Sequence, residues 1–177
     1  LDCPCGDARV GVLLAAHGAR ITGVDLNERF IAKARERFDA AGLGPEQAQL
    51  HVADMRTLPG LDGFDAVLNW FNSFGYFSVA EDFGVLVGFA AALRAGGRLL
   101  LEAPVREGLL DNIRHKCDAD GTPLSGIHWD ERTDRLVVRF SVPGPDGPRE
   151  VCSGTHMYSL TQYRLLLRAA GMRLETG

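Results

Sequence analysis

The sequence has little of three features that mark specialised protein classes. Four cysteines in 177 residues are too few for a disulfide scaffold. No apolar run approaches the roughly 18 to 20 residues that cross a bilayer, and the first residues form no signal-peptide pattern. The 23 Asp and Glu outnumber the 19 Lys and Arg, which gives a formal charge of −4 without any basic block. We therefore expect a cytoplasmic protein that binds a small molecule, with no nucleic-acid or membrane partner.

The composition is that of a folded globular chain. Hydrophobic residues make up 46% and charged residues 24%. The length predicts one domain over residues 1–177, and we find no linker or internal repeat. We expect the first strand, at Leu1, and the last strand, near Gly177, to be cut short, as in a fragment. The sequence leaves the oligomeric state open, with a homodimer as one possibility.

Over residues 1–102 short apolar runs alternate with segments of helical period. This alternation predicts an α/β fold, a mostly parallel sheet with helices on both faces. We expect strands at 19–25, 49–53, 64–69 and 98–101 and helices at 9–17, 27–42 and 81–93.

The pattern changes after Pro104. Residues 136–142 and 150–158 are rich in β-branched and apolar side chains, and they flank the turn cluster of residues 143–148. This arrangement predicts an antiparallel hairpin. A helix at 161–170 and a strand at 172–176 are expected to follow.

Small and acidic residues follow the predicted parallel strands, where ligands bind in such sheets. Gly6 allows a tight turn between Asp2 and Ala8, and the next helix offers free N–H groups. Asp25 is placed to accept hydrogen bonds from two ribose hydroxyls, which fits a dinucleotide or S-adenosylmethionine. Asp54 can accept a hydrogen bond from an adenine amino group, and the loop lacks G-x-G-x-x-G spacing. These residues favour S-adenosylmethionine.

The chain resembles the class I S-adenosylmethionine-dependent methyltransferases, whose fold is a Rossmann-like three-layer sandwich. Residues 69–77 look like a branch that acts on small molecules, including amine methylases. In that branch, inserted antiparallel strands cover the active site, and residues 104–158 would be the cover. The resemblance rests on five ordered pieces and a final helix and strand: residues 1–9, 22–27, 52–56, 64–69, 93–101 and 158–177.

The resemblance also implies a role for individual residues of the cofactor site. Gly6 and its neighbours would hold the methionine part, Asp25 the ribose, and Asp54 the adenine. The loop departs from the family pattern of three alternating glycines, because the corresponding positions hold Pro4, Gly6 and Ala8, and Pro4 has no N–H. The expected cofactor-binding residues are Asp2, Pro4, Cys5, Gly6, Asp7, Asp25, Leu26, Asp54, Met55, Asn69 and Trp70.

The expected reaction transfers a methyl group from S-adenosylmethionine to a small-molecule acceptor, an amine nitrogen by the resemblance. The products would include S-adenosylhomocysteine. The candidates for accepting a proton are Tyr76, His128 and His156, with Tyr158 beside them. No metal is expected, because Cys3-Pro4-Cys5 lacks further ligands at suitable spacing. Two alternatives stay open: a nucleotide-cofactor oxidoreductase and a non-catalytic module that binds S-adenosylmethionine.

Overall fold

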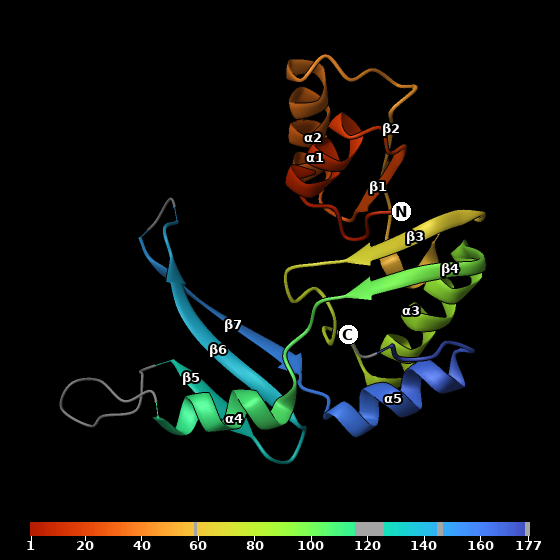
Figure 1. Ribbon diagram of the computed structural model, residues 1–177. Helices are drawn as coiled ribbons and strands as arrows, with labels where there is room; N and C mark the ends of the chain where they lie inside the picture. The colour runs from red at the N-terminus through yellow and green to blue at the C-terminus, as the bar shows by residue number, and fades with distance from the viewer. Residues whose placement is uncertain (59, 116–125, 145–146, 176–177) are drawn as a thin grey trace.

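The computed structural model describes residues 1–58, 60–115, 126–144 and 147–175 (Figure 1). Two parallel strand pairs form the central sheet: β1 (Ile21–Asp25) with β2 (Ala48–Val52), and β3 (Phe64–Asn69) with β4 (Leu93–Leu101). Residues 1–3 join the pairs, because Asp2 N donates to Thr22 O at 2.8 Å and Cys3 N to Leu68 O at 2.9 Å. The two strand pairs therefore lie on either side of residues 1–3. Both pairs are parallel, which confirms a mostly parallel α/β architecture.

Helices pack against this sheet in two groups, each with its own hydrophobic core. The helices α1 (Arg9–Ala16) and α2 (Glu28–Ala40) enclose one core with β1 and β2. The second core lies between β3, β4, α3 (Val79–Ala92) and α5 (Leu160–Ala169). Because the sheet is small and, in the part of the chain that the structure describes, only residues 1–3 join its halves, the full three-layer sandwich stays a prediction.

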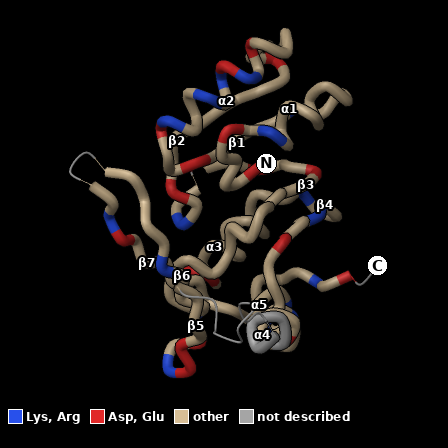
Figure 2. Tube along the Cα trace, turned by 90° about the vertical axis from the view of Figure 1, so that its left-hand side faces the viewer, with Lys and Arg blue, Asp and Glu red and all other residues tan. Residues whose placement is uncertain are grey.

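Local sequence signals explain where α2 begins and which face it buries. The Asn27 side chain accepts a hydrogen bond from Arg29 N at 3.0 Å and caps the helix. Ile31, Ala34 and Phe38 recur at helical spacing, and all three are buried. Lys and Arg are mixed with Asp and Glu along the rest of the helix (Figure 2). The buried stripe therefore fixes α2 against the sheet and aims its amino end at the carboxyl end of β1.

The hairpin forms as predicted, as part of a larger antiparallel sheet. Its strands are β6 (Arg135–Val142) and β7 (Arg149–His156), and β5 (Ile127–Asp130) pairs with β6. The sequence analysis missed β5 and the helix α4 (Arg106–His115). The strand predicted at 172–176 is wrong for residues 172–175, which pair with no neighbouring strand; residue 176 lies outside the described residues. None of the helices in the described part of the chain is both long and apolar enough to span a membrane.

Candidate active site

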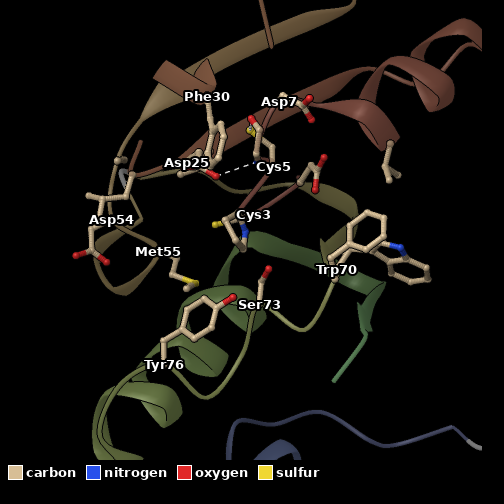
Figure 3. Close-up of a pocket in the computed structure, with 18 of the residues that line it drawn as sticks. Cys3, Cys5, Asp7, Asp25, Phe30, Asp54, Met55, Trp70, Ser73 and Tyr76 are labelled. Carbon is tan, nitrogen blue, oxygen red and sulfur yellow. Dashed lines mark hydrogen bonds between the residues drawn. The ribbon is translucent and has the colours of Figure 1, made fainter. Parts of the chain in front are cut away.

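A cavity of about 600 Å³ opens at the carboxyl ends of the parallel strands. This volume lies within the range of small-molecule and cofactor sites, roughly 300 to 1,000 Å³. Figure 3 shows that Asp54 and Met55 lie at one end and Trp70 at the other, with Asp25 between them. The lining comes from four segments: residues 2–7 with Arg9 and Val10, residues 24–26 with Phe30, residues 53–55, and Trp70, Phe71, Ser73, Tyr76 and Phe77.

The loop after residues 1–3 brings its backbone to the cavity surface at Gly6. Cys5 N donates to Val24 O at 2.8 Å, which ties the loop to β1. Gly6 has φ +54°, and no atom lies within 4 Å of the position that a Cβ would occupy. Because Gly6 lines the cavity, this space is available to a ligand that approaches the backbone closely. Ala8 adopts φ +58°, so the third position of the loop keeps a left-handed conformation without glycine.

Asp25 ends β1 with its carboxylate directed across the cavity floor toward the loop. Its Oδ2 accepts a hydrogen bond from Gly6 N at 2.9 Å, and its Oδ1 accepts one from Asn27 N at 2.8 Å. A carboxylate offers about four lone-pair sites, so both oxygens can accept further bonds from paired hydroxyls. Phe30 lies beside Asp25 (Figure 3) and is 43% exposed, which provides an apolar surface next to this acceptor.

Asp54 occupies the opposite end of the cavity from Trp70. It caps the short helix η1 (Met55–Thr57) and pairs with Arg56, whose Nη2 lies 2.7 Å from Asp54 Oδ2. Hydrogen bonds from Arg56 hold the pKa of Asp54 below its usual value, so the carboxylate stays ionised. Arg56 also pairs with Glu81 at 2.8 Å. The acceptor at this end is therefore fixed in place.

Asp2 is the most deeply buried carboxylate of the lining, at 3% exposure. Burial raises its pKa to about 6; the ammonium group of Leu1 lowers it and the Asp25 carboxylate nearby raises it. Within the described residues no Arg or Lys side chain pairs with Asp2, so a ligand that brings a positive charge would stabilise this buried carboxylate further. Four carboxylates and one guanidinium line the cavity within the described residues: Asp2, Asp7, Asp25, Asp54 and Arg9.

An aromatic wall, defined here as Trp70, Phe71, Tyr76 and Phe77, closes one side of the cavity. Trp70 meets Phe71 edge to face at 6.5 Å between ring centroids, and Tyr76 meets Phe77 in the same way at 6.4 Å. Phe71 and Asn72 both adopt left-handed backbone conformations, with φ +56° and +55°. Strained turns of this kind cluster at functional sites, and here the strain turns the chain sharply between the two aromatic pairs.

Contacts with the base of the hairpin hold the second aromatic pair in place. His156 N donates to Gly75 O at 2.6 Å, and the Arg135 guanidinium donates to Phe77 O and, at 2.7 Å, to Gly154 O. The buried Asp82 accepts hydrogen bonds from Phe77 N at 3.3 Å and from Tyr158 Oη at 2.8 Å. Burial raises the pKa of Asp82. The hairpin therefore supports the aromatic wall from behind.

Three predicted site residues lie away from the cavity. Asn69 is fully buried, and its Nδ2 donates to Cys3 O at 2.9 Å, so it fixes the loop from below. His156 stacks on Tyr158 at 4.5 Å between ring centroids, and burial lowers its pKa. His128 is exposed on β5. Neither histidine lines the cavity, and the Tyr158 hydroxyl donates its hydrogen bond to Asp82.

None of the described residues of 104–158 lines the cavity, so the cover over the active site stays a prediction. The contacts at Gly75 and Phe77 fix the base of the hairpin, and its strands stand beyond the carboxyl ends of β3 and β4 (Figure 1). Every other predicted cofactor residue lines the cavity, and so does Tyr76. The sequence analysis missed seven lining residues: Cys3, Arg9, Val10, Val24, Phe30, Ala53 and Ser73.

Fold and site together define an α/β protein with a cavity suited to a nucleoside cofactor. The sequence family described as Methyltransferase domain matches residues 1–97, more than half of the chain. A protein of Geobacillus sp. (strain WCH70) that carries a provisional name as a methyltransferase is 36% identical over 187 residues, covering 97% of this chain and 72% of that protein. The chain therefore belongs to the methyltransferase domain family, and the cofactor of this family is S-adenosylmethionine.

Two further relatives show how far the likeness extends. The S-adenosyl-L-methionine-dependent Diels-Alderase iccD of Talaromyces variabilis is 32% identical over 103 residues, covering 57% of this chain and 34% of iccD. The chain thus spans about a third of the length of some curated relatives. The sugar N-methyltransferase KedS8 from Streptoalloteichus sp. ATCC 53650 shares the fold, with a TM-score of 0.66, 23% identity, and coverage of 97% of this chain and 70% of KedS8.

The residues present fit this cofactor. The open space at Gly6 accommodates a ligand against the backbone, and Asp25 has acceptor sites left for ribose hydroxyls. Asp54 would be the acceptor for an adenine amino group, with Leu26 and Met55 as apolar neighbours in the lining; Arg56 already donates to both of its carboxylate oxygens. Asp2 supplies a negative charge for the ammonium group of the methionine part.

Proposed function

We propose that the chain transfers the methyl group of S-adenosylmethionine to an amine nitrogen of a small-molecule acceptor. The observation that carries this proposal is the convergence of Gly6, Asp25 and Asp54 on one cavity at the carboxyl edge of the sheet. The family match supports this cofactor over the nucleotide cofactor of an oxidoreductase.

The charge and the apolar surface of the lining support a cationic acceptor. Carboxylates outnumber cations among the described lining residues, and the aromatic wall adds ring faces that attract ammonium groups. An amine acceptor arrives largely protonated, so this surface would collect it. The solved structure KedS8, whose fold the chain shares, is named a sugar N-methyltransferase, which agrees with this acceptor class.

The bound cofactor would supply an electrophilic methyl group on a sulfonium. The protein has to hold the acceptor nitrogen in line with that methyl group, and such alignment can lower the barrier by roughly 7 to 11 kcal/mol. The hydrogen bonds of Asp82 and Arg135 to the Phe77 backbone, next to Tyr76, would serve this alignment. Tyr76 is the predicted proton acceptor that lines the cavity, and its 45% exposure leaves a path for the proton to solvent.

The relative iccD is named for a Diels-Alder reaction, so affinity for the cofactor alone would not establish methyl transfer. The test is a mass-spectrometric screen in which the chain and S-adenosylmethionine are incubated with primary amines, secondary amines and hydroxyl compounds as acceptors. We expect gain of one methyl group on amines and formation of S-adenosylhomocysteine. The matched control is Asp25→Asn, which keeps the size of the side chain and should show little product. Cofactor binding without methyl gain on any acceptor would contradict the proposal and favour a non-catalytic module.

A further inference from the structure

The methionine part of the proposed cofactor carries an α-carboxylate that must find donors in the cavity. Burying a carboxylate without hydrogen bonds is unfavourable by several kcal/mol. Most of the charged side chains that line the cavity are themselves carboxylates and would repel this group. The cavity therefore needs a specific donor for it.

Part of the loop backbone is already engaged in hydrogen bonds. Pro4 has no N–H. The N–H groups of Cys5, Gly6 and Ala8 already donate to Val24 O at 2.8 Å, to Asp25 Oδ2 at 2.9 Å and to Cys5 O at 2.9 Å. Among the described residues, the N–H groups of Asp7, Arg9 and Val10 donate to no protein acceptor, so they can receive a carboxylate. A cationic side chain beside them would add charge-assisted donors.

Arg9 is the one cationic side chain among the described residues that line the cavity. Its guanidinium carbon lies 5.0 Å from the centroid of the Phe71 ring, and its Nε lies 3.3 Å from Asp7 Oδ1. The ring occupies one face of the guanidinium and Asp7 faces its Nε. Within the described residues, neither Nη group forms a hydrogen bond to a protein acceptor. The guanidinium thus contacts Phe71 and Asp7, and both of its Nη groups can donate to a ligand.

Arg9 also lies at the correct end of the cavity. Phe71, which it contacts, packs against Trp70, and Trp70 lies at the end away from Asp54 (Figure 3). With adenine near Asp54 and ribose near Asp25, the remaining end receives the methionine part. Asp2 would meet its ammonium group and Arg9 its carboxylate, so the two charges of the amino acid would each face an opposite charge.

We propose that Arg9 binds the α-carboxylate of the cofactor and thereby selects amino-acid-bearing nucleosides over decarboxylated ones. This proposal rests on the proposed function, because it assigns a residue to the same ligand. An arginine suits the role, since its planar fork can donate two parallel hydrogen bonds to a carboxylate.

The test is calorimetric titration with two ligands, S-adenosylhomocysteine and its decarboxylated analogue, which keeps the amine and the nucleoside. We expect the wild-type chain to prefer S-adenosylhomocysteine by about tenfold, the effect of a partly exposed charge-assisted pair. Arg9→Met should weaken the affinity for S-adenosylhomocysteine by about tenfold and change the affinity for the analogue by less than about threefold. The Arg9 side chain is 63% exposed, so this variant should fold as the wild type does.

Arg37→Met is the matched control, because Arg37 also pairs with Asp7, at 2.6 Å, and does not line the cavity. It should leave the preference between the two ligands unchanged. An equal loss of affinity for both ligands in Arg9→Met, or no loss for either, would overturn the role of Arg9 while leaving the proposed function intact. Failure of both ligands to bind the wild-type chain would overturn the proposed function and this proposal together.

Discussion

Gly75 connects the aromatic wall to the hairpin and allows almost no other residue. It has φ +93°, and a Cβ there would lie under 3.0 Å from the carbonyl oxygen of His156, a distance that real Cβ atoms do not show. Three effects destabilise Gly75→Ala: the strain of alanine in a left-handed conformation, the overpacking against His156 O, and the weakened hydrogen bond from His156 N to Gly75 O. We expect the free energy of unfolding to fall by about 2 to 5 kcal/mol, measured by urea denaturation.

Gly84→Ala provides the comparison with the same chemical change. Gly84 is an exposed position within α3, and a Cβ there would meet no atom within 4 Å. Because alanine favours a helix over glycine, this variant should gain about 1 kcal/mol. Gly75→Ala should also weaken S-adenosylhomocysteine binding, since Tyr76 and Phe77 follow it in the chain. Wild-type stability of Gly75→Ala would refute the reasoning that this contact fixes the wall.

Three further predictions concern single side chains. Gly6→Ala should lower the free energy of unfolding by about 1 kcal/mol in thermal denaturation, because alanine is strained in the left-handed conformation of Gly6. It should also remove most of the affinity for the cofactor, because the new Cβ would enter only the cavity. Full affinity would refute the close approach of the ligand to this backbone. With its pKa near 6, Asp2 is protonated below that pH, so affinity for S-adenosylhomocysteine should fall as pH drops through 6 in calorimetric titrations. Asp2→Asn should lack this fall. Tyr158→Phe removes a donor from the buried Asp82 and should lower the free energy of unfolding in urea by about 1 to 3 kcal/mol at neutral pH. Because burial raises the pKa of Asp82, the loss should shrink in acid, where the carboxyl protonates; a loss independent of pH would count against the role of this pair.

The cofactor side of the cavity was predictable because it follows from one topological rule. Parallel strands bring their carboxyl ends to one edge of a sheet, so Asp2, Asp25 and Asp54 had to converge once the strands were recognised. The left-handed Ala8 could not be read from the sequence, because alanine rarely adopts that conformation.

The buried position of Asn69 could have been predicted from the alternation of side chains along β3. Side chains alternate along β3, and Asn69 shares the buried face with Val67, so its amide points into the core. Phe30 is a similar case, because the buried stripe of α2 runs through Ile31, Ala34 and Phe38. Phe30 precedes that stripe by one residue, which turns it to the rim beside Asp25.

The histidines could not be placed from the sequence, for a different reason. Where β5 and β7 lie depends on contacts between segments far apart in the chain, chiefly those of Arg135 with Phe77 and of His156 with Gly75. No local periodicity encodes such contacts. The hairpin itself was predictable, whereas its direction relative to the cavity was not.

The most direct test of the account is calorimetric titration of S-adenosylhomocysteine into the wild-type chain and Asp25→Asn. We expect saturable binding at one site, weakened roughly 10- to 150-fold by the substitution. The Asp25 carboxylate accepts from two backbone N–H groups and would also accept from two ribose hydroxyls, and an amide cannot replace it in both roles. Absence of binding to the wild-type chain, or equal affinity for both proteins, would contradict it.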